Sequence, residues 1–121
     1  MAYDDQNIFA KILRGEIPCD KLYEDEHTLA FKDINPIAPV HVLVIPKGAY
    51  VSMDDFSQNA SDVEIAGFMR AVGKIARDLG VDESGYRIIA NHGRDAFQEV
   101  PHLHIHILGK RNMKGMLRRI D

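Results

Sequence analysis

Three histidines alternate with apolar residues near the end of the chain, in the run His102-Leu103-His104-Ile105-His106-Ile107-Leu108. Successive side chains of a β-strand point to opposite faces, so the three histidines are predicted to share one face. The apolar residues between them share the other face, where they can bury into a core. The alternation therefore predicts a sheet strand with one apolar face and a row of imidazoles on the other.

Neighbouring histidines on such a strand lie about 6.7 Å apart, given a rise of ~3.3 Å per residue. A row of imidazoles either binds a metal or carries out proton transfer and nucleophilic attack near neutral pH. Chance crowding is the remaining alternative. It is disfavoured because Pro101 marks a defined start and the opposite face of the strand is predicted to be buried.

Length and composition indicate one domain. The chain has 121 residues, of which 45% are apolar and 27% charged, and it can bury a single core without disulfides. A net charge of −3 gives no overall basic field that would recruit nucleic acid. We therefore expect no nucleic-acid partner.

The single cysteine and the first residues of the chain indicate the cellular compartment. Cys19 excludes an intrachain disulfide framework, and an intracellular protein is the simplest interpretation. The first residues lack the pattern of a signal peptide, and no apolar run reaches the ~20 residues that span a bilayer. We expect a cytoplasmic protein with no membrane partner. A catalytic role for Cys19 has little support, because nothing local activates its thiol.

Two segments have the apolar spacing of helices. Residues 7–14 predict a short helix that ends at Gly15. A capping box at Ser61 and Glu64 starts a longer segment with apolar residues at i, i+3 and i+4, which ends at Gly80. An apolar stripe of this kind is typical of a core or dimer-interface helix.

Strands are predicted for residues 21–25, 28–33, 40–45, 86–90 and the histidine run. In residues 40–45 the valines share one face, and His41 lies on the other. Residues 47–60 are expected to be irregular, whereas the loop 91–101 is long enough to suggest a functional role.

The order of elements predicts an α+β fold with a mostly antiparallel five-stranded sheet, one long helix and one short helix. We place the domain in residues 1–110 and a basic C-terminal tail in residues 111–121. The tail region includes Arg118 and Arg119. The tail is predicted to be solvated or docked. The alternative is that its basic side chains contact a phosphate group.

At this point the sequence resembles a known family. The alternating histidine pattern resembles the signature of the histidine-triad superfamily of nucleotide hydrolases and transferases. Upstream blocks resemble its HINT branch, the histidine-triad nucleotide-binding proteins; these blocks are residues 7–12, 30–36, 38–47 and 98–101. The resemblance covers roughly residues 5–110 and implies a HIT-like fold and a homodimer.

The resemblance implies hydrolysis of a purine nucleoside 5′-phosphoramidate. His104 would attack the α-phosphorus and form a covalent nucleotidyl-histidine, which water then hydrolyses. The backbone carbonyl of His102 would fix the tautomer of His104. His106 would contact the phosphate and assist proton transfer to the leaving amine, and His41 would supply a further donor or orient the site.

The family also implies how an AMP-like ligand is held. Asp33 matches the ribose-binding aspartate, since a carboxylate accepts hydrogen bonds from both sugar hydroxyls. Asn91 resembles a loop asparagine on the phosphate side, and Gln98 and Glu99 precede the triad near the leaving group. Several HINT proteins have a small hydroxyl residue at the position of Glu99. The base-pocket residues implied are Ile8, Phe9, Ile12, Phe31 and Ile34.

Alternatives stay open. Dinucleoside polyphosphate hydrolysis of the Fhit-like type is the second activity, and a nucleotide-binding regulatory protein with little turnover is the third. Zinc held by the strand histidines with His41 is a rival from another class, although it leaves Asp33 without a purpose. The HINT resemblance implies neither a cofactor nor a metal. The chain also lacks the tryptophan-proline end of many HINT proteins.

Overall fold

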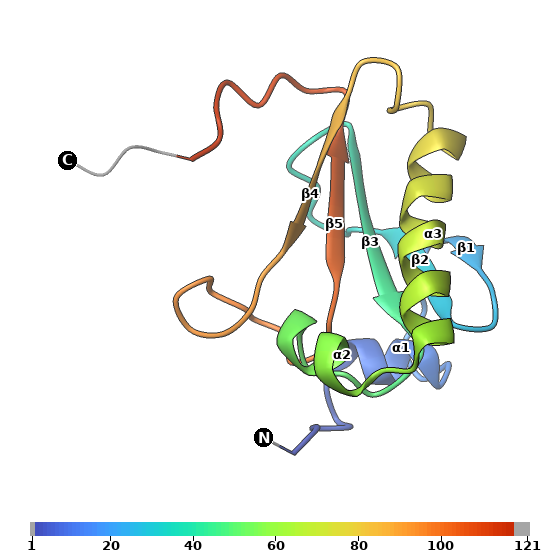
Figure 1. Cartoon of the computed structure of the whole chain (residues 1–121). Helices are drawn as coiled ribbons and strands as arrows, with labels where there is room; N and C mark the ends of the chain where they lie inside the picture. Colours follow the sequence, from blue (N-terminus) through green and yellow to red (C-terminus); the bar gives the residue numbers. More distant parts are fainter. Residues whose placement is uncertain (1, 118–121) are drawn as a thin grey trace.

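The five strands form one antiparallel sheet with the spatial order β1-β2-β3-β5-β4 (Figure 1). The structure is a computed structural model, and it describes residues 2–117. The strands are β1 (Lys21–Glu24), β2 (Thr28–Lys32), β3 (Val40–Pro46), β4 (Tyr86–Ala90) and β5 (Ile105–Gly109). The helices are α1 (Ile8–Leu13), α2 (Met53–Asn59) and α3 (Asp62–Asp78). The predicted α+β class and antiparallel sheet are confirmed.

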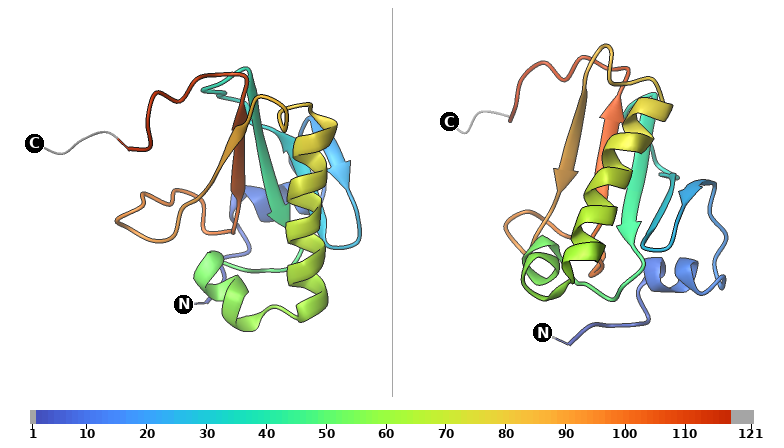
Figure 2. Two further views of the ribbon diagram at one scale, coloured as in Figure 1. Left: turned by 45° about the horizontal axis from the view of Figure 1, so that its top comes forward. Right: turned by 45° about the vertical axis from the view of Figure 1, so that its right-hand side comes forward.

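Helix α3 lies across one face of the sheet (Figure 2). Its start is fixed by the predicted capping box, in which Ser61 and Glu64 exchange side-chain-to-backbone hydrogen bonds. Gly80, with a φ of +73°, follows its end. The core beneath it combines helix residues with every second residue of β3 and β5; it includes Phe68, Val72, Ile75, Val42, Val44, Ile105 and Ile107.

The opposite face of the sheet is covered differently. A smaller apolar cluster there joins Phe9 of α1 to residues of β2 and β3, namely Leu29, Phe31, Leu43 and Ile45. Asn7 caps α1 by accepting a hydrogen bond from the Ala10 N–H. Helix α1 covers one end of this face, and the histidines lie on the rest of it.

Helix α2 corrects the expectation that residues 47–60 are irregular. Ser52 caps the helix by accepting from the Asp55 N–H, and Phe56 is its single buried residue. Two apolar positions, Met53 and Phe56, in a helix of seven residues are too few to show a helical period, which is why the pattern did not predict it. Residues 2–117 therefore contain one long helix and two short ones.

The histidine run is also shorter as a strand than predicted. Strand β5 begins at Ile105, so His102 and His104 precede it. In this segment the His102 N–H donates to the Val100 carbonyl and the Leu103 N–H donates to the Tyr50 carbonyl. These bonds replace sheet pairing, so the three histidines do not form one row on a regular strand.

Residues 111–117 leave the sheet at the end of β5 (Figure 1). Arg87 of β4 holds this segment by donating to the Gly115 carbonyl at 2.7 Å. Arg118 and Arg119 lie outside the described residues, and the boundary between domain and tail stays a prediction. No helix within residues 2–117 is long and apolar enough to cross a membrane.

Candidate active site

His104 is buried just before β5, and its orientation is set by the backbone. Its Nδ1 lies 2.7 Å from the His102 carbonyl oxygen. A carbonyl can only accept, so Nδ1 carries the proton and Nε2 of the neutral ring keeps a lone pair. The ring of Phe9 packs edge-on against the imidazole at 4.9 Å between centroids. Nε2 has no hydrogen-bond partner among residues 2–117, which leaves it available as a nucleophile.

His106 and His41 form a pair whose protons can be assigned in the same way. The Ile37 N–H donates to His41 Nδ1 at 3.1 Å, so the proton of the neutral His41 ring resides on Nε2. His41 Nε2 lies 2.9 Å from His106 Nδ1 and 3.3 Å from an Asp33 carboxylate oxygen. His106 therefore accepts at Nδ1 and carries its own proton on Nε2.

His102 is fully buried, and both of its ring nitrogens have partners. Nε2 lies 2.9 Å from the Pro46 carbonyl and must carry the proton. Nδ1 lies 2.5 Å from the Tyr3 hydroxyl. Sequence reasoning missed Tyr3, because no pattern near residue 3 marks a partner 99 positions away.

Burial favours the neutral form of the three histidines His102, His104 and His106. It lowers the pKa of His102 to about 4, and it also lowers the pKa of His104, where the carboxylates of Asp33 and Glu99 act in the opposite direction. Burial, aided by the neighbouring histidines, lowers the pKa of His106 to about 4. A neutral imidazole is the nucleophilic form, so His104 can act as a nucleophile at neutral pH.

A pocket of about 310 Å³ opens beside His104 and His106. Four of the predicted ligand residues lie in its wall, namely Phe9, Asp33, Asn91 and Glu99. Its remaining lining residues are Leu43, Ala96, Phe97 and Val100. Leu43 was not predicted as a site residue, although strand alternation had placed it on the same face as His41. The long loop 91–101 contributes half of this wall, consistent with a functional loop.

Other predicted residues lie elsewhere. Phe31 is buried behind Phe9, with 5.7 Å between ring centroids. Ile8 and Ile34 are 42% and 87% exposed. Gln98 accepts from the Gly93 N–H and donates to the Val51 and Val100 carbonyls, so its amide holds the loop in shape.

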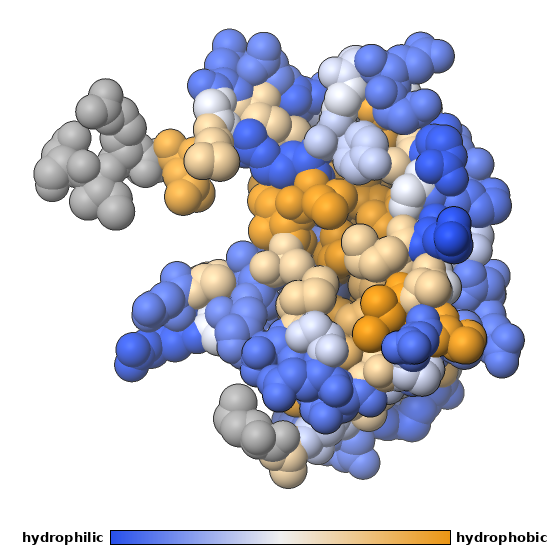
Figure 3. All heavy atoms as spheres, viewed as in Figure 1, coloured by the Kyte–Doolittle hydropathy of each residue, from blue (hydrophilic) through white to orange (hydrophobic). Residues whose placement is uncertain are grey.

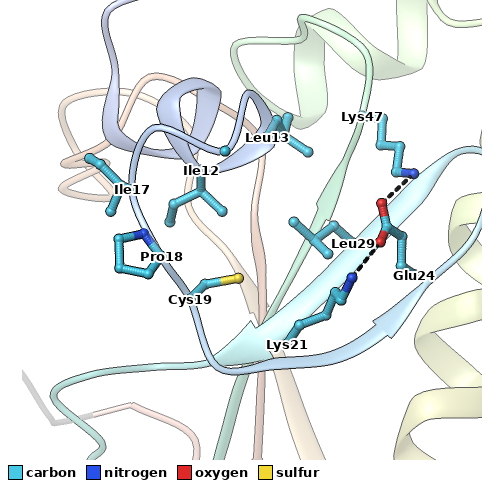
Figure 4. Close-up of a pocket in the computed structure, with 10 residues that line it drawn as sticks. Ile12, Leu13, Ile17, Pro18, Cys19, Lys21, Glu24, Leu29 and Lys47 are labelled. Carbon is cyan, nitrogen blue, oxygen red and sulfur yellow. Dashed lines mark hydrogen bonds and ion pairs between the residues drawn. The ribbon is translucent and has the colours of Figure 1, made fainter.

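Ile12 lines a second groove, of about 490 Å³, between α1 and the strands β1 and β2 (Figure 4). Its side chain faces this groove together with Pro18, Cys19 and Leu29, while Glu24 joins Lys21 and Lys47 at the rim. Burial raises the pKa of the Cys19 thiol. A raised pKa keeps the thiol protonated, so Cys19 is not an activated nucleophile.

Asp33, His41 and His106 bring one ligand atom each within 4.8 Å of one another, the spacing of a metal site. Their hydrogen bonds argue against that use. A metal needs the lone pair of His41 Nε2, but the Ile37 N–H already occupies Nδ1 and leaves the proton on Nε2. Zinc would have to displace either this proton or this bond.

The comparison with protein families matches the HIT domain over residues 14–113. The chain belongs to the HIT family. It is 64% identical over 115 residues to an uncharacterized 13.2 kDa HIT-like protein of Azospirillum brasilense, and the alignment covers 95% of this chain and 94% of the relative. It is 44% identical over 114 residues to the purine nucleoside phosphoramidase of Escherichia coli K12, covering 93% of this chain and 94% of that enzyme.

Solved structures agree with this family. A HIT family hydrolase from Clostridium thermocellum superposes with a TM-score of 0.85 at 42% identity, covering 95% of this chain and 99% of that one. A histidine triad protein from Clostridium difficile gives 0.81 at 43% identity, covering 97% and 100%. The predicted HIT-like fold is therefore confirmed.

Proposed function

We propose that this HIT protein hydrolyses purine nucleoside 5′-phosphoramidates through a nucleotidyl intermediate on His104. One observation carries the proposal: the 2.7 Å bond from His104 Nδ1 to the His102 carbonyl leaves the Nε2 lone pair free beside a pocket. The name of the Escherichia coli relative, a purine nucleoside phosphoramidase, supports the substrate class.

The reaction divides into two displacements. His104 Nε2 attacks the α-phosphorus, a bond from nitrogen to phosphorus forms, and the bond from phosphorus to the leaving amine breaks. The anionic substrate raises the pKa of His106 by attraction, so that His106 takes up a second proton when the substrate binds. This imidazolium gives its Nε2 proton to the leaving amine and returns to the neutral ring. Water then attacks the phosphorus, gives its proton back to His106, and releases the nucleotide and a free His104.

The pocket supports binding of the nucleotide. The Asp33 carboxylate would accept hydrogen bonds from the ribose hydroxyls, and Phe9 offers an apolar ring beside them. Asn91 lies on the loop side of His104, where the phosphate would sit. Gln98 would act indirectly, by holding that loop.

Hydrolysis of adenosine 5′-phosphoramidate in chelator-treated buffer tests the proposal. We expect turnover by the parent protein and a loss of at least about 10³-fold in kcat for His104→Ala, because the nucleophile is removed. The matched control is His27→Gln, a histidine remote from the pocket, which should retain activity. Turnover that appears only with added zinc would instead support the metal alternative.

Substrate choice distinguishes the remaining alternatives. Faster hydrolysis of diadenosine polyphosphates than of the phosphoramidate would favour the Fhit-like activity. Tight binding of AMP without turnover of either compound would favour a regulatory nucleotide-binding protein.

A homodimer is part of this proposal. Strand β4 is an edge of the sheet, and its outward side chains Tyr86 and Ile88 are 42% and 46% exposed. Apolar residues gather at the centre of the molecular face drawn in Figure 3. Met69 of α3 is 44% exposed. Sedimentation of the parent protein and of Ile88→Lys would test it, because a charge on this strand should yield monomers.

A further inference from the structure

The segment that carries the nucleophile has few backbone anchors. His102 and His104 precede β5, so their peptide groups lie outside its sheet pairing with β3 and β4. The N–H groups of residues 102 and 103 each make one backbone hydrogen bond. The buried His102 ring adds two further anchors of this turn, its bonds to the Pro46 carbonyl and the Tyr3 hydroxyl.

The Tyr3 bond is directional, and its donor can be assigned. His102 Nε2 gives its proton to Pro46, so Nδ1 is a lone pair and the Tyr3 O–H must donate to it. The hydroxyl oxygen in turn accepts from the Asn7 side-chain amide at 3.0 Å. The same asparagine caps α1, and Phe9 of that helix packs on both the His102 and His104 rings.

We propose that Tyr3 is a positioning residue for the reaction of His104, an inference that rests on the proposed function. Its hydroxyl holds the His102 ring, the His102 carbonyl holds His104 Nδ1, and this bond keeps the Nε2 lone pair aimed at phosphorus. Tyr3 itself lies outside the pocket lining and touches no reacting atom.

Loss of the hydroxyl would leave a buried, unpaired acceptor at His102 Nδ1. A buried polar atom without a partner is costly, so the ring would shift or recruit water. A shift of this ring moves the carbonyl of the same residue, and small displacements of a nucleophile reduce rates strongly. We expect Asp33 and Asn91 to stay in place, because the Tyr3 hydroxyl is bonded to His102 and Asn7 and to neither of them.

Tyr3→Phe is the test variant, because it keeps the aromatic ring and removes only the hydroxyl. The matched control is Tyr23→Phe in β1, away from the site, which removes a half-buried hydroxyl that donates to the Asp25 carboxylate. We expect kcat to fall about tenfold in Tyr3→Phe with KM unchanged, and both constants to be unchanged in Tyr23→Phe.

Imidazole ¹⁵N NMR supplies a measurement that needs no substrate. In the parent protein His104 should be protonated at Nδ1 alone, and Tyr3→Phe should show a mixture of Nδ1 and Nε2 tautomers. A His104 spectrum that is unchanged in Tyr3→Phe would overturn the inference, even if kcat falls. A mixed tautomer with parental kcat would overturn it too. If the parent protein shows no turnover, the proposed function fails, while the spectra still decide whether Tyr3 orients His104.

Discussion

The two faces of the sheet are built from alternate residues of the same strands, yet they are held by different forces. Under α3, β3 buries Val42 and Val44 against helix side chains. On the opposite face, the same strand presents His41 and Leu43 to the pocket and its surroundings. The first face rests on non-directional apolar burial, whereas the second combines a smaller apolar cluster with individual hydrogen bonds of fixed direction.

The two faces also differ in how far apart in sequence the contacting residues lie. The face under α3 is specified by local periodicity in each element. The histidine face depends on partners far apart in sequence: Tyr3 and His102 are 99 positions apart, and His41 and His106 are 65 apart. Substitutions on the first face should therefore act on stability, and substitutions on the second should act on chemistry.

Phe68→Ala should have the largest effect on stability. Phe68 is fully buried in the core under α3, so truncation should lower the free energy of unfolding by about 3–5 kcal/mol. Urea unfolding measures this, and kcat of the folded fraction should stay within about twofold of the parent value. The control is Met69→Ala, one residue along α3 and 44% exposed, which should cost less than about 1 kcal/mol. Equal losses in both variants would contradict this division of roles.

The histidine face should make stability depend on pH. Burial lowers the pKa of His102 to about 4, while the unfolded chain titrates near ~6.5. The unfolded chain thus binds more protons in this window. Stability should be highest above about pH 7 and fall as the pH decreases toward 4, with His102 alone accounting for about 2 kcal/mol at pH 5.

Urea unfolding at pH 7.5 and pH 5 measures that dependence. His106, whose pKa is also lowered to about 4, adds to the effect, so His106→Asn should show a smaller loss between the two pH values. A parent protein that is equally stable at both pH values would mean that the buried imidazoles take up protons without cost.

Asp33→Asn should have a smaller effect, read out in the choice between two ligands. A neutral amide accepts less strongly from ribose hydroxyls than a carboxylate, so the preference for a ribose over a 2′-deoxyribose substrate should fall about tenfold, or ~1.4 kcal/mol. Comparing kcat/KM for the two substrates measures it. Asp95→Asn, an exposed carboxylate in the loop 91–101, is the control. An unchanged preference in Asp33→Asn would remove Asp33 from the ribose site.

The sequence predicted those parts of the fold that repeat with a period. Alternation in residues 40–45 located β3 and both of its faces, and the capping box located α3 to within a residue. Helix α2 was missed because only Met53 and Phe56 pack it against the core, and two positions do not establish a helical period. The start of β5 was misplaced because the alternation of histidines continues into a segment whose backbone bonds go to Val100 and Tyr50.

The candidate site was predictable where a residue type in a pattern implied its chemistry. His104, Asp33 and Asn91 line one pocket, although their roles there stay predictions. Ile34 and Ile12 do not, because a pattern of apolar residues does not say which of two neighbouring cavities each side chain will line. Tyr3 lay beyond prediction, since its role follows from one contact with His102.

Trapping the covalent intermediate tests the central claim most directly. The parent protein would be mixed with adenosine 5′-phosphoramidate, quenched with alkali during turnover, and digested for mass spectrometry of its histidine peptides. We predict a nucleotidyl group on Nε2 of His104, and none in His104→Ala or on His106. Rapid turnover without any nucleotidylated protein, or a nucleotidyl group on another residue, would contradict the account.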